Sequence, residues 1–349
     1  MLIKKKEIAL LLIFLSLVVT NLFAENYYFK RYDKENGLSQ QTVFCAVQDR
    51  RGFLWFGTKV GLNRFDGTKF KNYVADPEQP NSLPNNTVLA LAEAPDGSLW
   101  LGISDGLCIY NPEKDTFAPF VSADLTIEGL IDNLVFDKQG NLWVINSKGI
   151  YCLDVKNGNH KFFPASDFFV PTGITVTQSG SVWVLGLDGN IYLFNPQRME
   201  FSFYPILTKE EKTKHILLYR ILECSNGDLV VTTDRIGARR FSPNNGEVKV
   251  LFSNDSQNNP IYIHTAIQRN KDEFWFGTES GIHIYQLDLG FIDHLQKSYN
   301  DAYSLSDNAV HMLLKDREEG IWVGTFFGGV NYLSNNNTLF DKYLPKDEK

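Results

Sequence analysis

Short runs of alternating apolar and polar residues, separated by turns that contain Gly or Asp, recur along most of the chain. In residues 42–73, Val43, Cys45 and Val47 alternate with the side chains between them, and turns near Gly61 and Gly67 delimit further short runs. Such runs joined by tight turns are typical of antiparallel strands in a meander. The only segment with helical character lies at residues 207–214. The pattern predicts an all-β fold.

A tryptophan marks the second predicted strand of each repeat. The six tryptophans of the protein share one position of the repeat, and a valine takes that position in the fifth of seven copies: Trp55, Trp100, Trp143, Trp183, Val230, Trp275 and Trp322. The mean spacing is about 44 residues, as in four-stranded propeller blades. We predict a seven-bladed β-propeller over residues 25–344, in which the indoles pack between blades and bind no ligand.

A glycine follows each tryptophan by six residues and is expected to form the turn after the second strand: Gly61, Gly106, Gly149, Gly189, Gly281 and Gly328. The predicted outer strands number one more than the blades require. A closed ring uses such a strand to cover its free edges. We therefore expect Phe29–Tyr32 to complete the seventh blade, with the segment from Leu339 either competing for that place or leaving as a linker.

The N-terminus has the features of a secretory signal peptide. Lys4 to Lys6 form a positive start, an apolar run extends from Ile8 to Val19, and Ala24 is a small residue before a polar segment. We expect residues 1–24 to be removed and the protein to be periplasmic; an uncleaved membrane anchor is the alternative. The net charge of −7 argues against a nucleic acid partner.

The four cysteines lie within apolar strand patterns and without paired spacing: Cys45, Cys108, Cys152 and Cys224. Disulfides have to be considered in an exported chain. Free cysteine is common in protein cores, and we expect four free core thiols.

The repeat pattern "NGLSxxxV…D…GxLWxGT…GLxxFD" resembles the two-component regulator propeller repeat of periplasmic sensors in hybrid two-component systems, over residues 27–344. In that family, propellers usually precede a membrane helix and a histidine kinase core and sense glycan breakdown products. The resemblance implies a non-enzymatic sensory module that binds an oligosaccharide or mediates dimer contacts. Because we find no kinase motif, the expected partners are a second propeller and kinase portion of a longer sensor, or a homodimer. Residues 345–349 are expected to be a tail or truncated linker.

Candidate ligand contacts follow from the strand register. Counting back from each tryptophan position predicts one side chain near the start of every inner strand, at one mouth of the central channel: Phe44, Leu89, Asp132, Thr172, Tyr219, His264 and His311. Turns and linkers expected on the same face add Lys59, Asp105, Lys148, Asp188, Arg235, Glu279, Phe327, Tyr262 and Asn308. Aromatic rings among carboxylates and amides suit a sugar. The alternative is a water-filled channel with solvated loops.

Enzymatic alternatives rest on few residues. The stretch "GISDG" around Ser104 matches a nucleophile motif but lies in a predicted strand hairpin, so we expect no catalytic role. His264 and His311 in adjacent blades could act as acid and base or bind a metal. Streptogramin lyases, which are seven-bladed propellers with a similar repeat, use a histidine with a glutamate. No acidic residue is placed beside the pair by the sequence. The other histidines lack metal-ligand spacing, and we expect no catalytic residue, metal or cofactor. A purely structural, protein-binding propeller is the third alternative.

Overall fold

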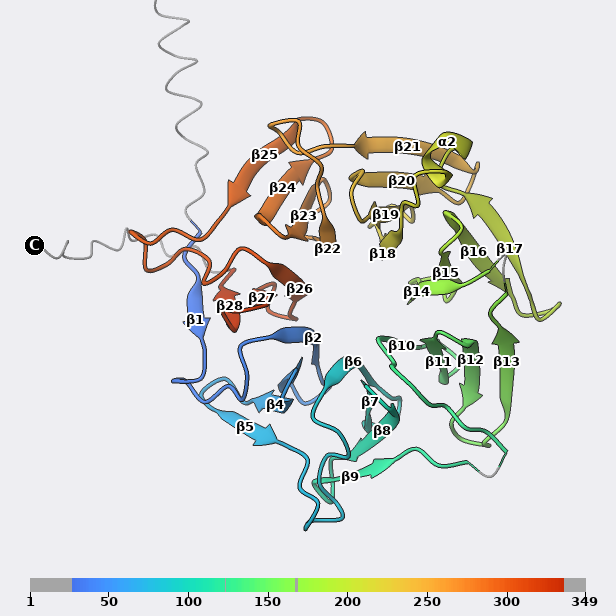
Figure 1. Cartoon of the computed structure of the whole chain (residues 1–349), viewed down its shortest axis with the longest axis vertical. Coiled ribbons are helices and arrows are strands. Elements are labelled where there is room, and N and C mark those ends of the chain that lie inside the picture. Colours follow the sequence, from blue (N-terminus) through green and yellow to red (C-terminus); the bar gives the residue numbers. More distant parts are fainter. Residues whose placement is uncertain (1–26, 123, 167–168, 336–349) are drawn as a thin grey trace, which may run out of the picture.

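The computed structural model describes residues 27–122, 124–166 and 169–335. These residues form seven four-stranded antiparallel sheets arranged as blades around a central axis (Figure 1). The predicted seven-bladed β-propeller is confirmed. The predicted signal peptide and the segment from Leu339 lie outside the described residues. Within the described part of the chain, no helix has the length and apolar character needed to cross a bilayer.

Each blade begins with an inner strand beside the axis and continues outward. The inner strands are β2 (Val43–Gln48), β6 (Val88–Glu93), β10 (Asn133–Phe136), β14 (Pro171–Val176), β18 (Leu218–Glu223), β22 (Ile263–Gln268) and β26 (Val310–Lys315). The second strands are β3 (Leu54–Thr58), β7 (Leu99–Ile103), β11 (Asn141–Asn146), β15 (Val182–Gly186), β19 (Leu229–Thr233), β23 (Glu273–Thr278) and β27 (Ile321–Thr325).

The third strands are β4 (Gly61–Phe65), β8 (Gly106–Asn111), β12 (Gly149–Asp154), β16 (Asn190–Asn195), β20 (Ala238–Ser242), β24 (Gly281–Gln286) and β28 (Val330–Leu333). The outer strands are β5 (Phe70–Tyr73), β9 (Thr116–Pro119), β13 (His160–Pro164), β17 (Glu200–Pro205), β21 (Glu247–Phe252), β25 (Gly290–Leu295) and β1 (Lys30–Tyr32). A short helix, α2 (Lys209–Lys212), begins with a capping box between Thr208 and Glu211 and lies in the segment predicted to be helical.

The N-terminal strand closes the ring. Strand β1 pairs antiparallel with β28, so the seventh blade combines the two ends of the described chain (Figure 1). The Tyr32 ring stacks on Trp322, and the Arg31 guanidinium donates to the Ser304 carbonyl at 2.9 Å. Closure by this strand leaves no gap between the first and last blades, as predicted.

The tryptophans fill the spaces between neighbouring blades. All six are buried, and Trp55 of blade 1 packs with Leu99, Leu101 and Tyr110 of blade 2. Trp322 of blade 7 likewise packs with Phe56 of blade 1. Each indole packs between two sheets, so every repeat that has a tryptophan contributes to the interface between its blade and the next one.

A buried aspartate orients the indole in blades 1, 3 and 7. The indole N–H groups of Trp55, Trp143 and Trp322 donate to Asp49, Asp137 and Asp316 at 2.8–2.9 Å. The other carboxylate oxygen accepts two backbone N–H groups of the turn between the first and second strands. One side chain therefore holds the turn and the tryptophan together, which explains the aspartate six residues before the tryptophan in these copies.

The glycine two residues after the tryptophan permits close packing near the axis. A Cβ at Gly57 would lie 2.4 Å from the Cys45 sulfur and 2.8 Å from the Val88 carbonyl oxygen of the next inner strand. In blade 7 the expected turn glycine, Gly328, is one residue away from the left-handed position. Gly329 has the positive φ of 75°, because this hairpin is one residue longer, with Thr325 donating to the Gly329 carbonyl. Gly328 therefore lies in the predicted turn, but the left-handed residue of this turn is the next one.

The four thiols are free, as expected, but only Cys108 and Cys224 are fully buried, while Cys45 and Cys152 are half-buried. Burial raises the pKa of Cys45, Cys108 and Cys152 to about 12. A thiol with such a pKa is protonated and unreactive at neutral pH.

Candidate ligand-binding site at the channel mouth

The seven side chains predicted from the register surround one cavity. This mouth cavity has a volume of about 470 Å³, and its lining includes Phe44, Leu89, Asp132, Thr172, Tyr219, His264 and His311, one from each blade. It lies on the face of the propeller that carries the turns between second and third strands. Leu130, Asn146 and Arg220 contribute further to its lining.

A β-bulge presents six of these side chains to the cavity. The pairing of the first and second strands skips one residue in six blades, and the skipped residues are Phe44, Leu89, Thr172, Tyr219, His264 and His311. In blade 3, Asp132 immediately precedes β10 instead. A bulged residue lacks a partner in the ladder and its side chain is redirected. The variable positions of the repeat are therefore those released from strand pairing.

Two histidines and a glutamate form a compact cluster at the mouth. The rings of His264 and His311 stack with centroids 4.4 Å apart and planes at 13°. Glu279 Oε1, from the hairpin between β23 and β24, lies 2.6 Å from His264 Nε2 and 3.9 Å from His311 Nε2. The sequence placed no acidic residue beside this pair, and that interpretation was wrong. Packing of blade 6 on blade 7 brings the three residues together.

The rest of the cavity wall has a different chemistry. The Tyr219 ring meets His264 edge-on at 5.5 Å and is partly exposed. The Thr172 hydroxyl donates to the Leu218 carbonyl at 3.1 Å, and the exposed carboxylate of Asp132 accepts from Asn133 at 3.3 Å. Imidazoles therefore face a hydroxyl and a carboxylate across the ring of blades, with an aromatic side chain between them.

The predicted rim residues are mostly held by contacts within the protein. Arg235 pairs with Asp234 at 2.9 Å, the Asp188 carboxylate accepts from the Tyr192 hydroxyl, and Asn308 accepts from the Lys297 N–H. Phe327 and Tyr262 are exposed, as are Lys59, Asp105 and Lys148. None of these residues lines the mouth cavity. Two of the rim residues contact residues that line the cavity: Glu279 contacts His264, and the Lys148 backbone N–H donates to the Asn146 side chain at 2.9 Å.

Ser104 has a structural contact. Its hydroxyl donates to the Asn85 side chain at 2.9 Å in the hairpin between β7 and β8. The strand-to-helix turn that a nucleophilic serine of this motif requires is not formed there.

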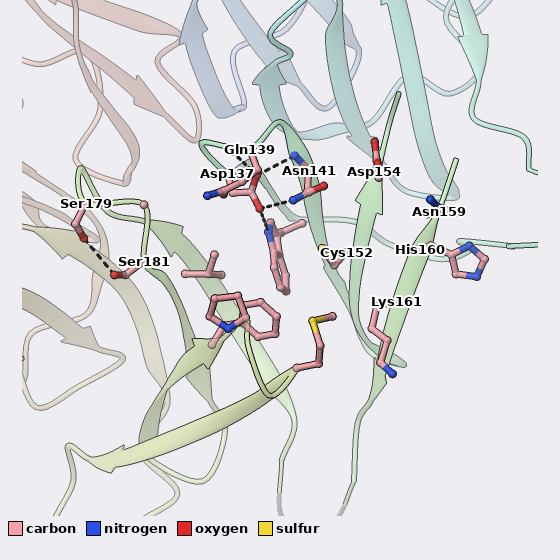
Figure 2. Close-up of a pocket in the computed structure, with 16 residues that line it drawn as sticks. Asp137, Gln139, Asn141, Cys152, Asp154, Asn159, His160, Lys161, Ser179 and Ser181 are labelled. Carbon is pink, nitrogen blue, oxygen red and sulfur yellow. Dashed lines mark hydrogen bonds between the residues drawn. The ribbon is translucent and has the colours of Figure 1, made fainter. Parts of the chain in front are cut away.

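A second hollow lies between blades 3 and 4, on the opposite face (Figure 2). Its volume is about 530 Å³, and Asp137, Asn141, His160, Ser179 and Ser181 are among its lining residues. The repeat pattern does not predict any of its polar residues as a ligand contact, because they come from turns and an outer strand of two different blades. The Asp137 carboxylate already accepts from the Trp143 indole N–H and from the Asn141 amide, the second of which is drawn in Figure 2.

A second histidine pair makes stability dependent on pH. His283 on β24 is 1% exposed and stacks on His294 of β25, with centroids 3.8 Å apart. Burial, assisted by the charge of His294, lowers the pKa of His283 to about 4. The unfolded chain takes up this proton near the ordinary histidine pKa of about 6.5. The folded state is therefore destabilised progressively as the pH falls from about 6.5 towards 4.

We expect the free energy of unfolding to fall by about 2–3 kcal/mol more in the wild type than in His283→Asn when the pH is lowered from about 7 to about 4.5. Urea unfolding of both proteins at the two pH values measures this difference. Equal losses in the two proteins would contradict the assignment to His283.

Comparison with known proteins identifies the repeat. Three stretches match the family model described as "Two component regulator propeller": residues 37–59, 82–105 and 304–327. They cover the linker and the first two strands of blades 1, 2 and 7. A segment of 58 residues, 17% of this chain, is 47% identical to Histidine kinase P4 of Formosa agariphila and spans 4% of that relative.

Solved structures share the fold. The extracellular domain of a protein assigned as a hybrid two component system of B. thetaiotaomicron matches 89% of this chain with 26% identity and a TM-score of 0.74. A second such domain from B. thetaiotaomicron matches 90% with 19% identity and a TM-score of 0.76. The chain spans 42% and 40% of those two chains.

Virginiamycin B lyase of Staphylococcus aureus matches 88% of the chain with 12% identity and a TM-score of 0.68, and this chain covers 99% of it. At that identity the likeness shows the propeller fold alone. Three stretches of the chain thus match the two component regulator propeller model, and the chain shares its propeller fold with extracellular domains of hybrid two component systems.

Proposed function

We propose that this propeller, which carries two component regulator repeats, is the non-enzymatic sensory module of a two component signalling protein and binds a glycan-derived oligosaccharide at the mouth cavity. The supporting observation is the set of bulged inner-strand residues. The same position of the repeat presents a phenyl, a phenol, a hydroxyl and two imidazoles to one cavity. A position that served packing alone would favour one residue type.

The chemistry of the wall fits a sugar. Tyr219 and Phe44 offer aromatic surface to the apolar face of a pyranose ring. Asp132, Asn146 and the histidines offer directional acceptors and donors for hydroxyl groups. Concave sites that combine apolar surface with a few polar groups are the usual form of small-ligand pockets.

The similarity to extracellular domains supports a location outside the cytoplasm, which we propose to be the periplasm, in agreement with the signal peptide predicted for residues 1–24. Because the chain spans 42% of the solved extracellular domain and 4% of the kinase relative, we propose that a further propeller and a kinase portion, or a second copy of the chain, transmit the signal.

We expect a Tyr219→Ala substitution to weaken oligosaccharide binding by roughly 10-fold, because an aromatic contact contributes about 1–1.5 kcal/mol. Isothermal titration calorimetry with neutral and uronic-acid oligosaccharides measures the loss. Phe203→Ala is the matched control, since Phe203 is 64% exposed on the outer strand β17 and lies outside the mouth cavity. Equal affinities of Tyr219→Ala and wild type, or the absence of any binding, would contradict the proposal.

The histidine pair favours one alternative, a lyase of the streptogramin-lyase type. Glu279 beside His264 supplies the carboxylate that orients an imidazole base. A double replacement of His264 and His311 by alanine separates the two functions. Product formation that disappears in this variant supports the lyase, whereas ligand binding without turnover in either protein supports the sensor.

A further inference from the structure

We infer that His264, Glu279 and His311 form a binding site for one divalent first-row transition metal ion of the Zn²⁺ class. This inference goes beyond the proposed oligosaccharide binding and does not depend on it. Two imidazole nitrogens and a carboxylate oxygen are ligands that Zn²⁺ prefers.

The three ligand atoms already converge. All lie within 4.8 Å of one another, and Glu279 Oε1 is 2.6 Å from His264 Nε2 and 3.9 Å from His311 Nε2. An ion with metal–ligand bonds of about 2.0–2.1 Å requires side-chain adjustments that lengthen the 2.6 Å contact between His264 and Glu279 and shorten the 3.9 Å separation between His311 and Glu279. This rearrangement involves side chains only, because the backbone of each ligand is held by the blade.

The supports of the cluster are rigid. His264 and His311 occupy equivalent bulges at the starts of β22 and β26. The His264 carbonyl accepts from Arg220 Nε at 3.1 Å, and the hairpin of Glu279 is closed by Thr278, whose hydroxyl donates to the Gly281 carbonyl at 2.9 Å. These contacts hold the backbone from which the ligand side chains project, so that only the side chains have to adjust when an ion binds.

The surroundings of the cluster suit a bound cation. His264 Nδ1 is buried and has no hydrogen-bond partner among the described residues. Arg220 brings positive charge nearby, and the carboxylates of Glu279 and Asp307 offset it.

The cluster lies at the mouth, where His264 and His311 border the cavity. Three protein ligands leave a fourth tetrahedral position for a water molecule or another oxygen. The site thus has the composition of an open metal site, in contrast to a closed structural one.

The test is a Zn²⁺ titration of the full chain after EDTA treatment and dialysis, with no oligosaccharide present. We expect one Zn²⁺ per chain with micromolar or tighter affinity. His264→Gln, His311→Gln and Glu279→Gln should each weaken binding by more than about 100-fold, since even loss of a supporting residue costs 10–100-fold. His160→Gln is the control, because His160 is exposed on β13, in a different blade.

Two further measurements distinguish a loss of Zn²⁺ binding from misfolding of the variants. Zn²⁺ should raise the melting temperature of the wild type and of His160→Gln but not of the three cluster variants, while the metal-free variants keep the far-UV circular dichroism of the wild type. Mg²⁺ and Ca²⁺, which prefer oxygen ligands, should not displace Zn²⁺. Absence of stoichiometric Zn²⁺ binding by the wild type, or an equal loss in His160→Gln, overturns the proposal.

Discussion

Replacing Trp275 with alanine is expected to lower the free energy of unfolding by about 3–5 kcal/mol. The Trp275 side chain is fully buried and packs with Ile282 of its own blade and with Val310 and Val323 of blade 7. Its removal takes away on the order of 200 Å² of buried aromatic surface at a blade interface. It also leaves Glu273 without the indole N–H that it accepts at 2.6 Å.

Urea unfolding followed by far-UV circular dichroism measures this loss without relying on tryptophan fluorescence. Phe203→Ala removes an exposed aromatic side chain of an outer strand and is expected to change stability by less than about 0.5 kcal/mol. Val230 occupies the tryptophan position of blade 5 and is also fully buried, so Val230→Ala should cost less than Trp275→Ala because its side chain is smaller. A loss below about 1 kcal/mol for Trp275→Ala would refute the role of the indole as the joint between blades.

Removal of strand β1 is expected to open the propeller. A chain that starts at Asp33 lacks the strand that pairs with β28, and also loses Phe29, Tyr32 and the contact from Arg31 to the Ser304 carbonyl. The Tyr32 side chain is buried against Trp322 and Phe65, so the single substitution Tyr32→Ala should lower the free energy of unfolding by about 3 kcal/mol. Loss of the whole strand should lower it further.

The matched control is a chain that starts at Tyr27 and keeps β1. We expect it to unfold in one cooperative step and to elute as a compact species in size-exclusion chromatography. The chain from Asp33 should unfold at lower urea concentration and associate through the exposed edge of β28. If the two chains have the same unfolding midpoint, ring closure does not depend on β1.

Most of the fold could be predicted because each blade repeats the same environment. Every blade repeats the tryptophan position, the turns that follow it and the alternation of apolar and polar residues in the strands. The pattern can therefore be recognised from seven copies even though each copy departs from it at some positions. The surplus outer strand near Tyr32 indicated closure for the same reason. Gly328 lies in the turn that the sequence predicts, but the longer hairpin gives the left-handed conformation to Gly329.

Counting from the tryptophan position predicts the ring of mouth residues correctly. This holds although the side chains at the starts of the inner strands do not follow the simple alternation of a regular strand. A bulge at the equivalent residue of six blades preserves the count while redirecting the side chain. The sequence contains no local sign of this bulge, since the skipped residues range from Phe44 to His311 in chemistry. Residues of the rim such as Arg235 and Asn308 were grouped with the site because nothing in their own segments shows that neighbouring groups hold them.

The sequence by itself determined the number of blades, their strand order and the position at which each inner strand faces the axis, because these properties depend on periodic patterns within one blade. The tertiary structure alone decided which groups meet across blades. His311 joins His264 and Glu279 only because blade 7 packs against blade 6, and the hollow in Figure 2 forms where blade 3 meets blade 4. The repeat pattern describes the residues of one blade. It does not specify how the side chains of two neighbouring blades pack against each other, and that packing decides the contacts between blades.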